Sequence, residues 1–236
     1  MRGSIQFLVI IICSLFIGCS ASEEELVEQG RDLLSESKYD AAIVAFDKAL
    51  TKNPNNYKAL NAKGVAQTRI GQLEASVMSF TMAINLDSTD YKAFFNRGNS
   101  KKELEDDAGA MYDYERAIDL QPDVVDIHLN KGVILFKYGE YERALFDFEF
   151  ALRLDTTNPL IYLNKGKTEL RTDNPEDAIY DFKKAIEFKS DYGEAFYWLG
   201  LVEIAQDNLV DGCAHLKNAE AFNFENAASA ISQNCK

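Results

Sequence analysis

Residues 57–90 read YKALNAKGVAQTRIGQLEASVMSFTMAINLDSTD, and the stretch that follows, 91–124, reads YKAFFNRGNSKKELEDDAGAMYDYERAIDLQPDV. The two stretches share a glycine at position 8, a small residue at position 20, an aromatic ring at position 24 and an alanine at position 27. The glycine recurs at a constant spacing, at Gly30, Gly64, Gly98, Gly132, Gly166 and Gly200. A fixed period of this length predicts an array of stacked structural repeats.

The period divides most of the chain into six units, 23–56, 57–90, 91–124, 125–158, 159–192 and 193–226. Within a unit, apolar residues follow helical spacing in two segments, for example 59–70 and 73–86, with Gly71 between them. Glycine inside a helix costs about 1 kcal/mol relative to alanine, so its recurrence indicates a close approach of two helices. We therefore expect position 8 to face position 20 across a helical hairpin, with the ring at position 24 filling the space between layers.

This period and these positions resemble the tetratricopeptide repeat (TPR) family over residues 23–226. The resemblance implies an all-α fold, a right-handed superhelical solenoid of about six helix-turn-helix units whose first helices line a concave groove. Such stacks need a terminal cap. We expect a C-terminal cap helix within 227–236, because Ala227, Ala228 and Ile231 would place apolar side chains on one side of it.

Residues 1–18 are predicted to be a secretory signal peptide, because Met1 and Arg2 precede an apolar run over 5–17. That run, about 13 residues long, is too short to span a bilayer comfortably. The sequence Gly18-Cys19-Ser20 resembles the lipobox of bacterial lipoproteins. The resemblance implies cleavage before Cys19, a diacylglycerol on its sulfur, and a polar tether over 19–25. An uncleaved signal anchor with an incidental thiol is the alternative.

The lipobox resemblance also implies a location. A lipidated Cys19 would hold the chain on a membrane of the bacterial cell envelope. Ser20 after the acylated cysteine favours the outer membrane over the inner one. Multiple acyl chains anchor a protein durably, whereas a single chain binds only marginally.

The charge of the chain argues against nucleic acid as a partner. Asp and Glu number 38 against 25 Lys and Arg, which gives a formal net charge of -13. An acidic surface repels phosphate backbones. Gly166-Lys167-Thr168 resembles the end of a phosphate-binding loop, but Ile161 stands where that motif needs its first glycine. We therefore expect neither nucleotide nor nucleic-acid binding.

Catalytic and metal chemistry are not expected either. Four cysteines and two histidines are too few for a zinc framework. The acidic clusters 23–25 and 105–107 lack the alternating ligands and glycine of a calcium loop, so they are expected to be solvated. No nucleophile stands at a fixed spacing from a base. The sequence thus predicts no enzyme activity, no cofactor and no metal site.

Cys213 and Cys235 remain after the signal peptide and Cys19 are set aside. If the mature chain lies outside the cytoplasm, these two thiols are expected to form a disulfide. The bond would connect the cap helix to the last repeat. The alternative is two separate thiols, one of them buried.

An asparagine recurs at position 6 of three successive units, as Asn96, Asn130 and Asn164. The TPR resemblance implies that position 6 points into the concave groove. An amide both donates and accepts hydrogen bonds, so it can hold an extended peptide backbone. The alternative is that these amides satisfy local polar contacts. The full predicted groove set is Lys92, Phe95, Asn96, Asn99, Asn130, Val133, Phe136, Asn164 and Lys167.

Some TPR co-chaperones hold a C-terminal carboxylate with a clamp of lysine, asparagine and arginine side chains. The corresponding positions of repeats 3 to 5 carry Phe95, Asn99, Asn130, Leu160 and Asn164, so the basic members are missing. That particular clamp is therefore not predicted.

The predicted partner is a protein or an extended peptide segment. The predicted function is that of a non-catalytic scaffold or adaptor, anchored to a membrane of the bacterial envelope. The alternative keeps the fold and assigns a chaperone-like role, in which the groove holds unfolded or translocating polypeptide.

Overall fold

The computed structural model describes residues 21–235 of the chain, and the regular elements in that range are all helices. Thirteen helices occur there: α1 Glu23–Ser35, α2 Tyr39–Lys52, α3 Tyr57–Arg69, α4 Leu73–Leu86, α5 Tyr91–Glu103, α6 Asp107–Leu120, α7 Val125–Lys137, α8 Tyr141–Leu154, α9 Pro159–Arg171, α10 Pro175–Phe188, α11 Gly193–Ala205, α12 Leu209–Ala221 and α13 Ala227–Asn234. The predicted signal at 1–18 and Cys19 lie outside the described residues.

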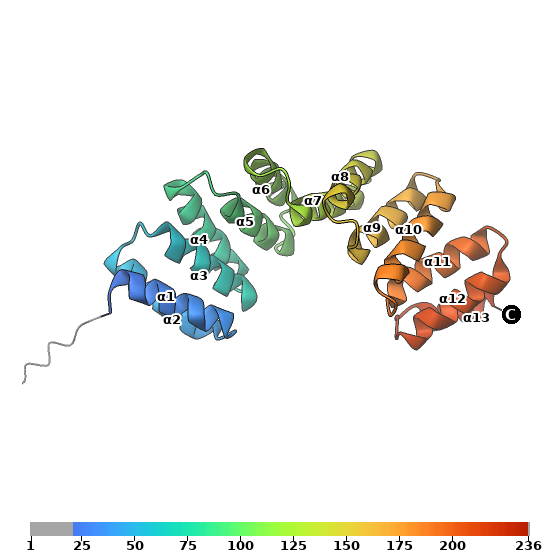
Figure 1. Ribbon diagram of the computed structural model, residues 1–236, viewed down its shortest axis with the longest axis horizontal. Helices are drawn as coiled ribbons and strands as arrows, with labels where there is room; N and C mark the ends of the chain where they lie inside the picture. The colour runs from blue at the N-terminus through green and yellow to red at the C-terminus, as the bar shows by residue number, and fades with distance from the viewer. Residues whose placement is uncertain (1–20, 236) are drawn as a thin grey trace, which may run out of the picture.

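The helices pair into six hairpins, α1 with α2 through α11 with α12, and each hairpin packs on the next. Figure 1 shows the hairpins following an arch, with α1 and α13 far apart and α6 and α8 on the outer side. First helices of neighbouring units also approach one another, as α1 does α3 and α7 does α9. The first helices therefore line the inner, concave face of an all-α superhelical solenoid.

The glycine at position 8 meets the ring at position 24 of its own unit. A Cβ built on Gly64 would lie 2.7 Å from the ring of Phe80, well inside contact distance. The rings of Phe46, Phe80, Tyr114, Phe148 and Phe182 are fully buried. The expected approach of position 8 to position 20 is closest in the sixth unit, where a Cβ on Gly200 would lie 2.8 Å from the carbonyl oxygen of Gly212. In the first five units the ring stands nearer, because it fills the space that the missing Cβ leaves.

A left-handed residue ends the first helix of every hairpin. The six residues are Ser37, Gly71, Glu105, Gly139, Asp173 and Asp207, with φ between 60° and 77°. This backbone conformation lets the turn satisfy the last carbonyls of the helix, as in the bond of 2.8 Å from Lys38 N to Leu33 O. Only two of the six positions are glycine, so the other four carry a local strain.

The chain begins its first helix earlier than the predicted tether allows. Ser22 caps α1, because its hydroxyl accepts from Glu25 N at 3.1 Å and the Glu25 carboxylate accepts from Ser22 N at 2.7 Å. Glu23, Glu24 and Glu25 form the first turn of α1, where carboxylates interact favourably with the helix dipole. A tether over 19–25 is therefore wrong for residues 23–25.

The C-terminal helix α13 packs on the last hairpin. Ala227 and Ala230 are buried, whereas Ala228 is exposed, so the buried face differs by one position from the expected one. Cys213 of α12 and Cys235 are joined by a disulfide, with Cα atoms 5.7 Å apart. Across residues 21–235, no helix is both long and apolar enough to cross a membrane.

Candidate functional site on the concave face

A row of buried ion pairs links the two helices of units 3 to 5. Arg97 donates to both carboxylate oxygens of Asp113, at 2.9 and 2.6 Å, and Lys131 lies 2.9 Å from Asp147. The next pair of the row is Lys165 and Asp181, also at 2.9 Å. The three aspartates are buried at the same repeat position. These side chains are paired with one another inside the hairpins and are therefore not available to bind a ligand.

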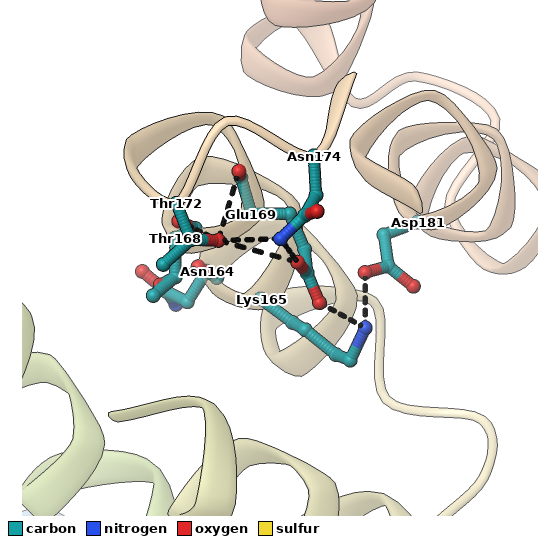
Figure 2. A network of polar contacts seen from close by, with 7 residues as sticks. All are labelled: Asn164, Lys165, Thr168, Glu169, Thr172, Asn174 and Asp181. Atoms are coloured by element: carbon teal, nitrogen blue, oxygen red, sulfur yellow. Dashed lines mark hydrogen bonds and ion pairs between the residues drawn. The ribbon is translucent and has the colours of Figure 1, made fainter. Parts of the chain in front are cut away.

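Lys165 lies between two carboxylates, as Figure 2 shows, because Glu169 accepts at 3.0 Å from the same ammonium group as Asp181. Burial raises the pKa of Asp181 to about 6, and the negative charge of Glu169 adds to the rise while Lys165 opposes it. Asn174 and Thr172 complete the cluster around Glu169. The network fixes the turn between α9 and α10.

His128 is also a structural group. Its Nδ1 lies 2.9 Å from Asp147, its Nε2 lies 2.8 Å from the carbonyl oxygen of Pro122, and its ring stacks on Phe150. His215 also has a carboxylate partner, since its Nδ1 lies 2.6 Å from Glu203. Nowhere in residues 21–235 do three His, Cys, Asp or Glu side chains form a group that could hold a metal ion.

The acidic segment 105–107 is only partly solvated. Asp107 is 4% exposed and pairs with Lys137 of the next unit, and Tyr138 Oη donates to the same carboxylate at 3.1 Å. Asp106 caps α6 by accepting from Gly109 N at 2.9 Å. The expectation of a solvated cluster is wrong for Asp107, because its partners come from the following unit of the chain.

The concave face holds a cavity of about 440 Å³ between units 2, 3 and 4, which we call the central cavity. Three of the predicted groove residues, Asn96, Asn99 and Asn130, line it. Its other lining residues are Val65, Thr68, Arg69, Phe80, Lys102 and Glu103. The cavity thus lies where the in-phase asparagines of units 3 and 4 meet.

Hydrogen bonds organise the amides of this cavity. Asn99 Oδ1 accepts from Tyr114 Oη at 2.7 Å and from Asn130 Nδ2 at 3.0 Å. Asn130 Oδ1 accepts from Lys102 Nζ at 2.8 Å. In the described part of the chain, the Nδ2 groups of Asn96 and Asn99 donate to no acceptor. These two amides are therefore free to donate to a ligand.

Asn164 has the same repeat position as Asn96 and Asn130 but a different environment. Its Nδ2 donates to the carbonyl oxygen of Leu160 at 2.8 Å, one turn earlier in α9. In Figure 2 its side chain points away from Lys165 and Asp181. The three asparagines therefore do not share one set of contacts.

A second cavity of about 430 Å³ adjoins the central one, since Val65 lines both. Lys92 is the predicted groove residue found here, together with Arg31, Tyr57, Lys58, Asn61 and Asp90. The side-chain oxygen of Asn61 is buried and accepts no hydrogen bond. An unpartnered buried acceptor carries a free-energy cost that a ligand N–H would relieve.

The far end of the groove is more apolar. A cavity of about 380 Å³ is lined by Phe136, Lys167, Leu170, Arg171 and Trp198. Lys167 pairs with Glu194 at 2.9 Å and lies over the ring of Trp198. The remaining predicted groove residues, Phe95 and Val133, pack against the cores of their units.

Lys102, Arg69 and Trp198 line these cavities but were not predicted to do so. The signal for Lys102 was present in the sequence, because positions 92, 95, 99 and 102 follow helical spacing along one face of α5. Continuing the predicted stripe by one turn reaches Lys102. Trp198 lies in the sixth unit, whereas the repeated asparagines lie in units 3 to 5.

The convex face carries a feature of its own. One apolar side chain from each of five successive second helices is more than half exposed: Val44, Met78, Tyr112, Phe146 and Tyr180. They share repeat position 22 and so form a line across α2 to α10. We call these five residues the convex line, and they serve as the control surface in tests of ligand binding on the concave face.

The fold and the groove define a helical repeat protein whose inner face is hollowed by ligand-sized cavities. A tetratricopeptide repeat family model matches residues 27–90 and 95–159, which is more than half of the chain. The chain belongs to the tetratricopeptide repeat family. No curated protein matches the chain at a significant level.

Solved structures show the same fold. The chain is 23% identical to a MamA protein, with a TM-score of 0.65, covering 72% of this chain and 92% of that one. It is 20% identical to YrrB, described as a TPR protein with an unusual peptide-binding site, with a TM-score of 0.69 and coverage of 80% and 98%. It is 18% identical to a tetratricopeptide repeat protein from Parabacteroides merdae, with a TM-score of 0.63 and coverage of 91% and 99%. At these identities the likeness concerns the fold alone.

Proposed function

We propose that this protein is a non-catalytic scaffold or adaptor that binds an extended segment of a partner protein in its concave groove. The observation that carries the proposal is the row of three cavities on the concave face, with the free amides of Asn96 and Asn99 in the central cavity and Phe136 and Trp198 in the cavity at the far end. Amides suit a peptide backbone and aromatic rings suit apolar side chains. YrrB, a protein of the same fold, is described as having a peptide-binding site.

The charged clusters support the non-catalytic part of the proposal. The carboxylates of Asp113, Asp147 and Asp181 are buried inside hairpins and neutralised by Arg97, Lys131 and Lys165. A catalytic group has to reach a reacting atom in an accessible pocket. These pairs reach none of the three cavities.

We also propose that the protein acts at a membrane of the bacterial envelope, outer rather than inner, through a lipid on Cys19. The support is the sequence alone, an apolar run that ends in Gly18-Cys19-Ser20. Cys19→Ala should leave an uncleaved or soluble form in cell fractionation. Unchanged size and membrane fractionation of Cys19→Ala would contradict this anchor.

Site-specific photocrosslinking in cells tests the groove. A photoreactive residue at Asn96 or Phe136, on the concave face, should capture the partner, whereas the same residue at Tyr112 or Phe146 on the convex face should not. The opposite pattern would place the contact on the convex line. A single stoichiometric partner supports the scaffold, and a broad set of unfolded chains would instead support the chaperone-like alternative.

Substitution gives a matched control. Asn99→Ala combined with Asn130→Ala should weaken partner capture, because both amides line the central cavity. The control is Asn164→Ala. Asn164 has the same repeat position as Asn130, but its amide donates to a carbonyl oxygen of its own helix. Capture that depends on Asn164 as strongly as on Asn130 would contradict the placement of the site in the central cavity.

A further inference from the structure

The two adjoining cavities over units 1 to 4 are basic in a chain that is acidic overall. Five cationic side chains line them, against two carboxylates, Asp90 and Glu103. The five cations are Arg31, Lys58, Arg69, Lys92 and Lys102. The chain as a whole has 38 acidic and 25 basic residues. The sign of charge in the groove is therefore the reverse of that of the whole molecule.

Most of these cations lack a counter-ion. Within residues 21–235, the side chains of Lys58, Arg69 and Lys92 form no ion pair and no hydrogen bond. This differs from the hairpin interior of units 3 to 5, where Arg97, Lys131 and Lys165 each contact a buried aspartate. The cations inside the hairpins are thus paired with carboxylates, whereas in that range only Arg31 of the five that line the two cavities pairs with one, Glu28 at 3.7 Å. An unpaired row of one sign attracts a ligand of the opposite sign.

Lys102 is the most informative member of this row. Its ammonium group is partly buried and its hydrogen-bond partner is a neutral oxygen, Asn130 Oδ1, at 2.8 Å. Burial lowers the pKa of Lys102, and the nearby carboxylates of Glu103 and Asp107 only partly oppose this. A carboxylate placed here would contact the ammonium group and the free amide N–H groups of Asn96 and Asn99. Charge-assisted hydrogen bonds of this kind are about twice as strong as neutral ones.

We propose that the groove selects an acidic extended peptide, and that one of its carboxylates binds at Lys102 between Asn96, Asn99 and Asn130. This rests on the proposed function and names the chemistry of its partner. The cation comes from position 12 of unit 3, which lies outside the position set of the co-chaperone clamp. A peptide suits the site better than a polyanion because the buried oxygen of Asn61 and the amides need N–H and C=O partners.

The length of the site can be estimated from the fold. Three intervals of about 8–10 Å separate the axes of four neighbouring first helices, so these axes span roughly 24–30 Å. An extended chain covers about 3.3 Å per residue, so about 7–9 residues would reach from unit 1 to unit 4. The acidic first turn of α1, with Glu23 and Glu24, limits the basic region at its N-terminal end.

The test uses two fluorescent 12-residue peptides and the chain 21–236 in solution. One peptide carries Glu or Asp at every third position among Ser, Thr and Val, and the other replaces each Glu with Gln and each Asp with Asn. We expect the acidic peptide to bind at least about tenfold more tightly in fluorescence polarisation, and its Kd to rise with salt. Equal affinities for the two peptides would overturn the proposal.

Two variants test whether Lys102 supplies the positive charge that binds the acidic peptide. Lys102→Gln should weaken binding of the acidic peptide about tenfold, whereas Lys217→Gln, the same change at an exposed residue of α12, should have no effect. Thermal unfolding monitored by circular dichroism checks that both variants fold. A further readout is the pKa of Lys102 by NMR, which should rise when the acidic peptide binds. Equal losses in the two variants would overturn the assignment to Lys102.

The outcomes separate this inference from the proposed function. If crosslinks from Asn96 capture a partner but charge in the peptides has no effect, the scaffold proposal is supported and the acidic preference is refuted. If crosslinks from the concave face capture nothing, the scaffold proposal and the acidic preference are both refuted. A 12-nucleotide single strand that binds more tightly than the acidic peptide would overturn the choice of a peptide.

Discussion

The ring of Phe148 lies against Gly132, where a Cβ on the glycine would come within 2.6 Å of the ring atom Cε1. Phe148 is fully buried, so the ring has no free space into which to move. The contact recurs in the first five units, and it explains why glycine is retained inside a helix despite its entropic cost.

Gly132→Ala should therefore destabilise the protein, by about 1–3 kcal/mol, because overpacking a close-packed core forces a ring or a backbone to shift. Chemical denaturation measures the change. Combining Gly132→Ala with Phe148→Leu should cost less than the sum of the two single changes, because the sixth unit naturally places Leu216 on Gly200. Additive losses would mean that the contact is not the cause.

The constant spacing of the glycines predicted the repeats and their hairpins, because each close approach requires a small residue at a fixed position. The family was indicated by the resemblance of the period and of several repeat positions to the tetratricopeptide repeat pattern. The contacts of charged side chains were harder to predict. Asp107 follows two acidic residues in a turn, and the sequence does not show that Lys137 will bury it. A partner supplied by the next unit becomes visible only when the units are stacked.

The groove residues were predicted only in part, because the sequence does not show which contacts the neighbouring unit supplies. Repeat position alone grouped Asn164 with Asn96 and Asn130, yet a local bond to Leu160 occupies the amide of Asn164. Asn130 instead meets Asn99 and Lys102 of the preceding unit. Repeat position indicates which way a side chain points, whereas the neighbouring unit determines whether it is free for a ligand.

Left-handed turn residues provide a second prediction. Glu105 has φ of 62° at the position where Gly139 has φ of 77°. A non-glycine residue in this region costs about 1 kcal/mol, so Glu105→Gly should stabilise the protein by roughly 0.5–1 kcal/mol. The matched change Gly139→Ala should destabilise it by a similar amount. Thermal and urea unfolding measure both, and shifts of the same sign would contradict the argument.

Asp181 provides a prediction about pH. Its pKa of about 6 in the folded protein lies above the usual value of 3.8, because it is buried. The folded state therefore binds a proton that the unfolded state has already released between about pH 4 and pH 6. This contribution to stability is fully present below about pH 4 and is lost as the pH rises through 6.

The comparison with Asp181→Asn isolates this effect. As the pH rises from 4 to 7, the wild-type protein should lose up to about 3 kcal/mol of unfolding free energy relative to Asp181→Asn, which cannot ionise. NMR titration of the Asp181 carboxyl carbon gives the pKa directly. Parallel stability curves for the two proteins would show that this carboxyl does not titrate in that range.

The disulfide between Cys213 and Cys235 should stabilise the end of the solenoid. It closes a loop across a sequence separation of 22 residues, for which loop-closure entropy predicts about 3 kcal/mol. Reduction, or Cys213→Ala with Cys235→Ala, should release α13 and expose Ala227 and Ala230. Helices α1 to α10 should stay folded, because each hairpin contacts only its neighbours.

Hydrogen exchange measures this release. Exchange should rise in α13 and α12 when a reductant is added, and the double variant should show the raised exchange without a reductant. Exchange in α13 that ignores the reductant would mean that packing of α13 on α11 and α12 holds the cap by itself.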